Sequence, residues 1–362
     1  MLSYRKLAMR VLGRPLHTGD SGSPRPASQR AAAFILTAIM LTSLTAPAFA
    51  KTWCIEDGNI TVKAGDTGND VTQKGETTYG DTDTIITNQN KDIASSNTVT
   101  IETNDKNDKV EVTLKDVNIN VGSDSGSALT SNGDVTLTLK GDNSLTGGNG
   151  GSGISSNGSL TITGGENDSL TAKGGSGRSG IFSSGGVTIS GGTVNATGGS
   201  SGSDSGDGIH SGSLTMKGGT VNAKGGSGAD GGRGISSSGS VTISGGSTVT
   251  ANGGSGTISG GDGICSFDRV AISGGTVEAA GGNGSGSDVG NGIISNDIDL
   301  SGSLELTAKA GSPNGKALSQ RGNELDLNTI KDKLGPGAKV TATDADGKVI
   351  DQVSTPRPVE PE

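Results

Sequence analysis

Bulky apolar residues are scarce in this sequence. Hydrophobic residues make up 29% of it and aromatic residues only 2%. A conventional globular core in a chain of this length needs more apolar volume, so the composition excludes such a core. Glycine is abundant instead, at 66 of 362 residues. Two classes remain, a disordered glycine- and serine-rich chain or a repeat fold that buries a thin, regular core.

Cysteine, histidine and aromatic side chains are too few for several kinds of site. Cys54 and Cys265 are the only cysteines, and in a stacked repeat they would lie many coils apart, so we expect no disulfide. After residue 50 the one histidine is His210, which disfavours a zinc site or a Ser-His-Asp triad, and we expect it to be an exposed strand residue. We expect no aromatic stripe for stacking sugars, because that part of the chain holds only Trp53, Tyr79, Phe182 and Phe267.

The first 50 residues have the features of a secretory signal peptide. Six basic residues precede an apolar run, residues 31–44, and Ala48-Phe49-Ala50 is a cleavage site of the small-x-small type. The apolar run is too short to span a membrane stably. We therefore expect residues 1–50 to be removed and the protein to be secreted, either extracellular or on the cell surface.

The rest of the chain is acidic. The signal peptide takes six of the 28 basic residues and one of the 37 acidic residues, which leaves 22 basic against 36 acidic. Such a surface repels nucleic acid and anionic lipid, so we expect neither as a partner, and it suits divalent cations. A plainer interpretation of the charge is solubility outside the cell. No later apolar run is long enough for membrane insertion.

A short strand pattern recurs along the chain. Alternating apolar and polar residues, typical of a β-strand with one buried face, return at intervals of 25 to 29 residues. These strands begin at Val135, Leu160, Val187, Leu214, Val241, Val270 and Ile298. A second strand follows each turn, at apolar positions that run from Leu170 to Leu306, and a third begins at positions that run from Leu129 to Ile293.

Three apolar columns that stay in phase over seven coils argue against disorder in this region. We predict an all-β fold, a right-handed parallel β-helix or solenoid, with about 27 residues and three short strands per coil. The stacked apolar columns form its core, and glycines supply the turns. Regular coils are expected over residues 116–325. Residues 51–115 are expected to form an N-terminal cap and the first coils, 326–353 a C-terminal cap, and 354–362 a disordered tail.

A column of serines accompanies the apolar columns. One serine stands two residues after each apolar residue that begins a third strand. We expect these serines to form a hydrogen-bonded ladder along the axis, and not to be nucleophiles, because no base recurs beside them. The column consists of Ser131, Ser156, Ser183, Ser211, Ser237, Ser266 and Ser295.

Acidic residues gather in the glycine-rich loops. If neighbouring loops stack, Asp204, Asp207 and Asp230 lie close together, and their mutual repulsion favours a bound cation. We take these three as candidate metal ligands with calcium as the candidate cofactor, and a flexible, solvated acidic loop is the alternative. Asp207, Arg233 and Asp262 also predict an alternating column of ion pairs. Arginine normally stays protonated, so Arg233 is disfavoured as the base of a calcium-dependent lyase, and we expect no enzyme.

Several repeats resemble those of a known family. Asp207-Gly-Ile-His-Ser211 and residues 213–223 are similar to the repeat of secreted carbohydrate-binding β-helix proteins of Gram-positive bacteria, and residues 187–196 and 270–279 repeat the likeness. The resemblance covers roughly residues 53–325. It implies a polysaccharide-lyase-like β-helix that binds plant-type or acidic glycans, with calcium in some members.

From these observations we expect a secreted, non-catalytic protein that binds a polysaccharide. The alternative is an extracellular adhesin or structural spacer, whose ligand is a protein or which has no ligand. A glycan partner would have to be held by polar side chains, main-chain groups or a cation, because the sequence offers so few rings.

Overall fold

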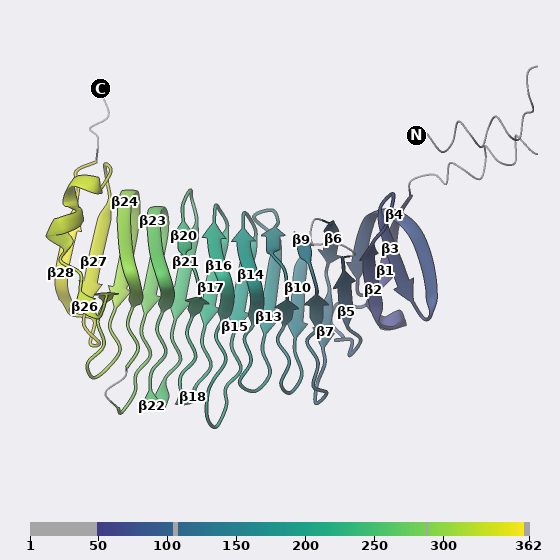
Figure 1. Cartoon of the computed structure of the whole chain (residues 1–362), viewed down its shortest axis with the longest axis horizontal. Coiled ribbons are helices and arrows are strands. Elements are labelled where there is room, and N and C mark those ends of the chain that lie inside the picture. Colours follow the sequence, from purple (N-terminus) through teal and green to yellow (C-terminus); the bar gives the residue numbers. More distant parts are fainter. Residues whose placement is uncertain (1–48, 104–107, 287–288, 358–362) are drawn as a thin grey trace, which may run out of the picture. The chain divides into compact units, whose positions relative to one another are not determined.

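The computed structural model describes residues 49–103, 108–286 and 289–357. Strands of successive coils pair in parallel, with a spacing of about 28 residues, and the described chain winds into about eight turns of a solenoid (Figure 1). The predicted parallel β-helix is therefore confirmed. Of the predicted signal peptide, residues 1–48 lie outside the described residues, as do residues 358–362 of the predicted tail.

Each regular coil contributes strands to three faces, which we call A, B and C. Face A stacks the strands that carry the Ile-x-Ser or Leu-x-Ser pattern, together with β2 and β5 before them and β25 after them. In order along the axis they are β2 (Ile60–Ala64), β5 (Val99–Glu102), β8 (Leu129–Ser131), β11 (Ile154–Ser156), β14 (Ile181–Ile189), β16 (Ile209–Met216), β19 (Ile235–Ser237), β23 (Ile264–Ala280), β24 (Ile293–Lys309) and β25 (Leu318–Gln320).

Faces B and C stack the other two strands of each coil. Face B begins with β1 (Phe49–Cys54), β4 (Glu76–Thr87), β6 (Lys109–Lys115), β9 (Asp134–Lys140) and β12 (Leu160–Thr163), and continues through β14, β16, β20 (Val241–Ile243), β23 and β24. Face C consists of β7 (Asn118–Asn120), β10 (Asp142–Thr146), β13 (Ser169–Lys173), β15 (Thr193–Thr197), β17 (Thr220–Lys224), β21 (Thr248–Asn252), the ends of β23 and β24, and β27 (Lys339–Thr343).

The sequence predicts separate strands on faces A and B, but in several coils one strand continues through the corner between them. In β14 and β16 one strand runs through both faces, and its pairing register shifts between Ser183 and Gly186. In β23 and β24 a single strand covers all three faces. These corners are bends with irregular register, which let hydrogen bonding continue from one face to the next.

The core is a set of apolar columns inside the three faces. Ile181, Ile209 and Ile235 stack in register on face A and are fully buried, as are their counterparts on faces B and C. A single coil cannot shield these side chains from water. The stabilising free energy of burial, about 1.5–3 kcal/mol for each side chain, is therefore gained only when neighbouring coils stack.

Antiparallel strands close both ends of the solenoid. At the N-terminal end, β3 (Asn69–Gln73) lies antiparallel to both β2 and β4, and a short 3-10 turn, η1 (Ile55–Asp57), follows β1. At the C-terminal end, β26 (Asn323–Glu324) and β28 (Val349–Ser354) pair antiparallel with β25 and β27, beside the 3-10 helix η2 (Leu327–Lys333). Such caps cover strand edges on which another chain could otherwise pair.

Glycine-rich loops connect face C to the next face A and project together on one side of the coils (Figure 1). Their necks are joined by backbone hydrogen bonds of 2.7–3.0 Å that zigzag along the axis, alternately within one coil and to the preceding coil. We call this chain of hydrogen bonds the glycine seam. Its members are Gly126, Gly148, Gly151, Gly175, Arg178, Gly199, Gly206, Gly226, Gly232, Gly254, Gly261, Gly282, Gly290, Gly311 and Gly315.

Most positions of the seam require glycine because the backbones approach very closely there. A Cβ atom added to Gly199 would lie 1.7 Å from the carbonyl oxygen of Gly175, and one added to Gly226 would lie 2.3 Å from that of Gly199. Beyond the seam, two loop tips pair as the short strands β18 (Gly228–Asp230) and β22 (Gly256–Ser259). The abundance of glycine thus comes from close packing of loops as well as from turns.

Candidate binding groove

A groove follows the corner between the glycine seam and face A. It consists of two cavities of about 670 and 350 Å³ that share Ser205 and Asp207. The larger extends toward the C-terminal end as far as Gly322, and the smaller extends toward the N-terminal end as far as Ser127. We call the two together the corner groove. Its walls come from successive coils, so it lies along the axis of the solenoid.

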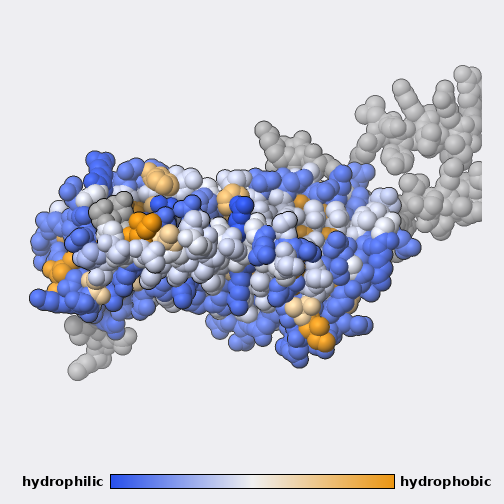
Figure 2. Space-filling view, turned by 90° about the horizontal axis from the view of Figure 1, so that it is seen from below, coloured by the Kyte–Doolittle hydropathy of each residue, from blue (hydrophilic) through white to orange (hydrophobic). Residues whose placement is uncertain are grey.

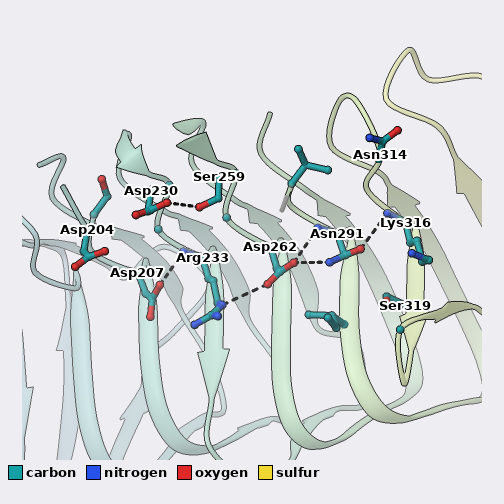
Figure 3. A pocket seen from close by; sticks show the side chains of 18 residues that line it. Asp204, Asp207, Asp230, Arg233, Ser259, Asp262, Asn291, Asn314, Lys316 and Ser319 are labelled. Atoms are coloured by element: carbon teal, nitrogen blue, oxygen red, sulfur yellow. Dashed lines mark hydrogen bonds and ion pairs between the residues drawn. The ribbon is translucent and has the colours of Figure 1, made fainter. Parts of the chain in front are cut away.

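One wall of the corner groove is a column of polar side chains, each two residues before face A (Figure 3). Asp207 Oδ1 accepts the backbone N–H of Arg233 at 2.7 Å, and Asp262 Oδ1 accepts that of Asn291 at 2.8 Å. Asn291 Oδ1 in turn accepts the N–H of Lys316 at 3.0 Å. In three coils, therefore, a side chain accepts a hydrogen bond from a backbone N–H of the next coil. This matters because a buried backbone N–H without an acceptor is destabilising.

Of the predicted ion pairs of Arg233 with Asp207 and Asp262, only the one with Asp262 forms. The guanidinium of Arg233 pairs with Asp262, with Nε 3.3 Å from Oδ2. Toward Asp207, however, the hydrogen bond comes from the backbone of Arg233, and the second carboxylate oxygen of Asp207 lies 2.9 Å from Nδ1 of His210. The alternation of charge in sequence therefore does not produce a continuous ladder of ion pairs, because a carboxylate can also accept backbone donors.

Arg233 interacts electrostatically with the buried thiol of Cys265. Burial by itself would lower the pKa of Arg233, but nearby Cys265, Asp262 and Asp207 together raise the pKa above its ordinary value. Desolvation raises the pKa of Cys265 to about 11, although the adjacent Arg233 opposes the shift. The arginine therefore stays charged, the thiol stays protonated, and both cysteines are free.

The three candidate metal ligands all line the larger cavity, but each has a different environment. Asp204 is exposed, Asp230 accepts a hydrogen bond from the hydroxyl of Ser259, and Asp207 is held by Arg233 and His210. Asp204 and Asp230 do come together, as an isolated parallel bridge between neighbouring loops. Within the described ranges, no three His, Cys, Asp or Glu residues form a group that could hold a metal ion. Calcium binding stays a prediction.

The rings of two residues, Phe182 and His210, lie together in the smaller cavity. Phe182 and His210 are paired in register on adjacent strands of face A, β14 and β16. Their ring centroids are 5.5 Å apart and the ring planes differ by 18°, so the rings stack. His210 is only 35% exposed and is oriented by Asp207, so it is more constrained than the exposed strand residue that we expected. Phe182 and His210 occupy equivalent positions in successive repeats of the sequence, and this alignment could have predicted that the two rings are neighbours.

The remaining rings do not extend this stack. Trp53 is buried in the N-terminal cap, where its Nε1 donates to Asp81 Oδ2 at 2.8 Å, and Tyr79 is exposed on β4 of the same cap. Phe267 is exposed beside Arg233, whose guanidinium carbon lies 6.0 Å from the ring centroid. The two-ring stack is therefore a local feature and not a stripe.

The serine column is buried, but it is not a chain of serine–serine bonds. Ser131 donates to Ser156 Oγ at 2.8 Å, whereas Ser183, Ser266 and Ser295 donate to turn carbonyls of the preceding coil. The hydroxyl of Ser211 has no partner among the described residues. These serines tie successive corners together, and none of them has a hydrogen bond to His210 among the described contacts.

The face toward which the loops point is mostly hydrophilic or of intermediate hydropathy (Figure 2). Hydrophobic residues form small, separate patches on it, which gives no broad apolar surface on the side that the figure shows. No helix among the described residues is long and apolar enough to cross a membrane.

Comparison with known proteins adds no family to these observations. Neither the protein-family models nor the curated proteins nor the solved structures gave a match to the chain.

Proposed function

We propose that this chain is a secreted, non-catalytic protein that binds a polysaccharide along the corner groove. The observation that carries the proposal is the continuity of the two cavities, which meet at Ser205 and Asp207. Because the groove crosses successive coils, a linear polymer can contact several of them at once, and weak contacts then add up. The resemblance of the repeats to secreted carbohydrate-binding β-helix proteins supports the same function.

The lining of the corner groove suits sugar hydroxyls. Polar side chains and loop backbone groups outnumber apolar side chains, and several of the polar groups are fixed by hydrogen bonds before any ligand arrives. Fixed partners reduce the entropy that binding must overcome. Calcium bound near Asp204 and Asp230 would add a site for acidic sugars.

A catalytic role is not part of the proposal. A lyase would need a base near the substrate, and Arg233 is paired with Asp262 and keeps its charge. A secreted location follows from the predicted signal peptide at residues 1–50.

The test is a glycan array probed with residues 51–362, once with calcium and once with a chelator. We expect binding to at least one class of polysaccharide. The Asp262→Ala variant should weaken that binding, while Lys217→Gln, at an exposed position after β16, should not. Absence of binding to every polysaccharide would favour the rival function, an adhesin or spacer with a protein ligand or none.

A further inference from the structure

Three side chains in the smaller cavity depart from the pattern of their own columns. On face A the middle position of the Ile-x-Ser strand holds Thr130, Ser155 and Ser236 in nearby coils, but Phe182 and His210 in the two coils between. In the glycine seam, Arg178 is the only member that is not glycine. All three departures line one cavity of about 350 Å³.

Arg178 is held at this place by its backbone alone. Its N–H donates to Gly175 at 2.9 Å, and its carbonyl oxygen accepts the N–H of Gly199 at 2.8 Å, as glycines do elsewhere in the seam. Its side chain is exposed, and among the described residues it forms no ion pair. In a chain whose acidic residues outnumber its basic ones, the guanidinium of an arginine that lines a groove can pair with an anionic group of a ligand.

Phe182 and His210 supply a flat surface in the same cavity that Arg178 lines. The stacked pair is fixed on one side by the parallel strands and on the other by the contact of His210 with Asp207. Both oxygens of Asp207 already have donors, from Arg233 and His210, so this carboxylate is partly neutralised and repels an approaching anion less than a free one would. Aromatic surfaces with a few polar groups around them are typical of small-ligand sites.

We propose that Arg178, Phe182 and His210 form a subsite for one sugar ring that bears a carboxylate. The ring packs on Phe182 and His210, and its carboxylate pairs with the guanidinium of Arg178. A carboxylate matches the planar fork of arginine with two parallel hydrogen bonds. This inference rests on the proposed polysaccharide binding and deepens it, since it names a uronate as the sugar that the N-terminal half of the corner groove selects.

The test compares two forms of one oligosaccharide, an oligogalacturonate and its fully methyl-esterified form, by titration calorimetry in a chelator. The esters keep the rings and remove the charge. We expect the wild-type protein to bind the acid form about tenfold more tightly or better, which is the effect of one charged hydrogen-bonded pair. Arg178→Gln should abolish that preference, whereas Phe182→Ser and His210→Ser should weaken the binding of both forms.

Serine is the matched substitution for the two rings because Ser155 and Ser236 occupy the same column in the coils on either side. The control variants are Lys217→Gln, an exposed cation after β16, and Tyr79→Ser, an exposed ring in the N-terminal cap, and both should bind like the wild type. Circular dichroism of each variant checks that the β-helix is intact.

Three results would overturn the subsite. One is equal affinity of the wild type for the acid and ester forms, with no effect of Arg178→Gln. Another is tighter binding of a sulfated galactan than of the oligogalacturonate, which would assign a sulfate ester in place of the carboxylate. The third is binding of other glycans on the array but of neither oligogalacturonate form. In each of these cases the wild type still binds a glycan, so the proposed function stands, whereas failure to bind any glycan removes both.

Discussion

The carboxylate of Asp207 accepts the backbone N–H of Arg233 in the next coil at 2.7 Å. Asn291, in the same column, does the same for Lys316 with an amide oxygen. At these two places in the column an acceptor oxygen holds the next coil, with a negative charge in one case and without one in the other.

This relationship predicts that Asp207→Asn is tolerated and Asp207→Ala is not. The alanine variant leaves the N–H of Arg233 without its acceptor, which should cost about 1–3 kcal/mol in the free energy of unfolding. Asp204→Ala, at an exposed position, should change it by less than about 0.5 kcal/mol. Denaturant unfolding of the three variants checks this, and an asparagine variant as unstable as the alanine variant would show that the charge matters.

The glycine seam predicts strongly position-dependent effects of alanine. In Gly226→Ala the new methyl group would meet the carbonyl of Gly199, so we expect a loss of about 2 kcal/mol or more in stability. Gly202→Ala is the matched control, since an added Cβ there meets nothing within 4 Å. Thermal unfolding followed by circular dichroism measures both, and similar melting temperatures for the two variants would contradict the seam.

Calcium binding at the loop carboxylates predicts a stabilising effect of the ion. Because Asp204 and Asp230 lie on neighbouring loops, a bound cation should relieve their repulsion and raise the melting temperature above that measured in a chelator. Asp230→Asn should reduce the rise, and Asp57→Asn, in the N-terminal cap, should leave it unchanged. A melting temperature that does not respond to millimolar calcium would rule this site out.

Asp168 predicts part of the acid sensitivity of the fold. The backbone N–H groups of Gly165 and Gly141 lower the pKa of Asp168 below its ordinary value. Because the folded-state pKa is the lower one, the stabilisation is present above the unfolded pKa of about 3.9 and is lost as the pH falls below it through the folded value. Asp168→Asn should therefore lose stability at pH 7 and show a shallower loss between about pH 4 and pH 2. Equal pH dependence of the two proteins would refute this.

The absence of lyase activity is a prediction with a direct assay. Arg233 keeps its charge beside Asp262, so we expect no unsaturated product from polygalacturonate with calcium, followed by ultraviolet absorbance. Sustained product formation that disappears in Arg233→Ala would make the protein an enzyme.

The sequence by itself determined the coil and its core. Val187, Leu214 and Val241 alternate with polar residues at nearly equal intervals, and they stack on face B as predicted, because a strand with one buried face can place its apolar residues in only one register.

Only the tertiary structure decided which polar groups meet at the corners. Asp207 could equally have faced a cation, a metal or solvent, and its actual partners, Arg233 and His210, depend on the bend of the backbone before face A. The stack of Phe182 on His210 and the placement of Arg178 in the seam depend in the same way on how loops of unequal length align. Burial of apolar area fixes the register of the strands, whereas short-range polar contacts depend on local geometry that the spacing of residues does not specify.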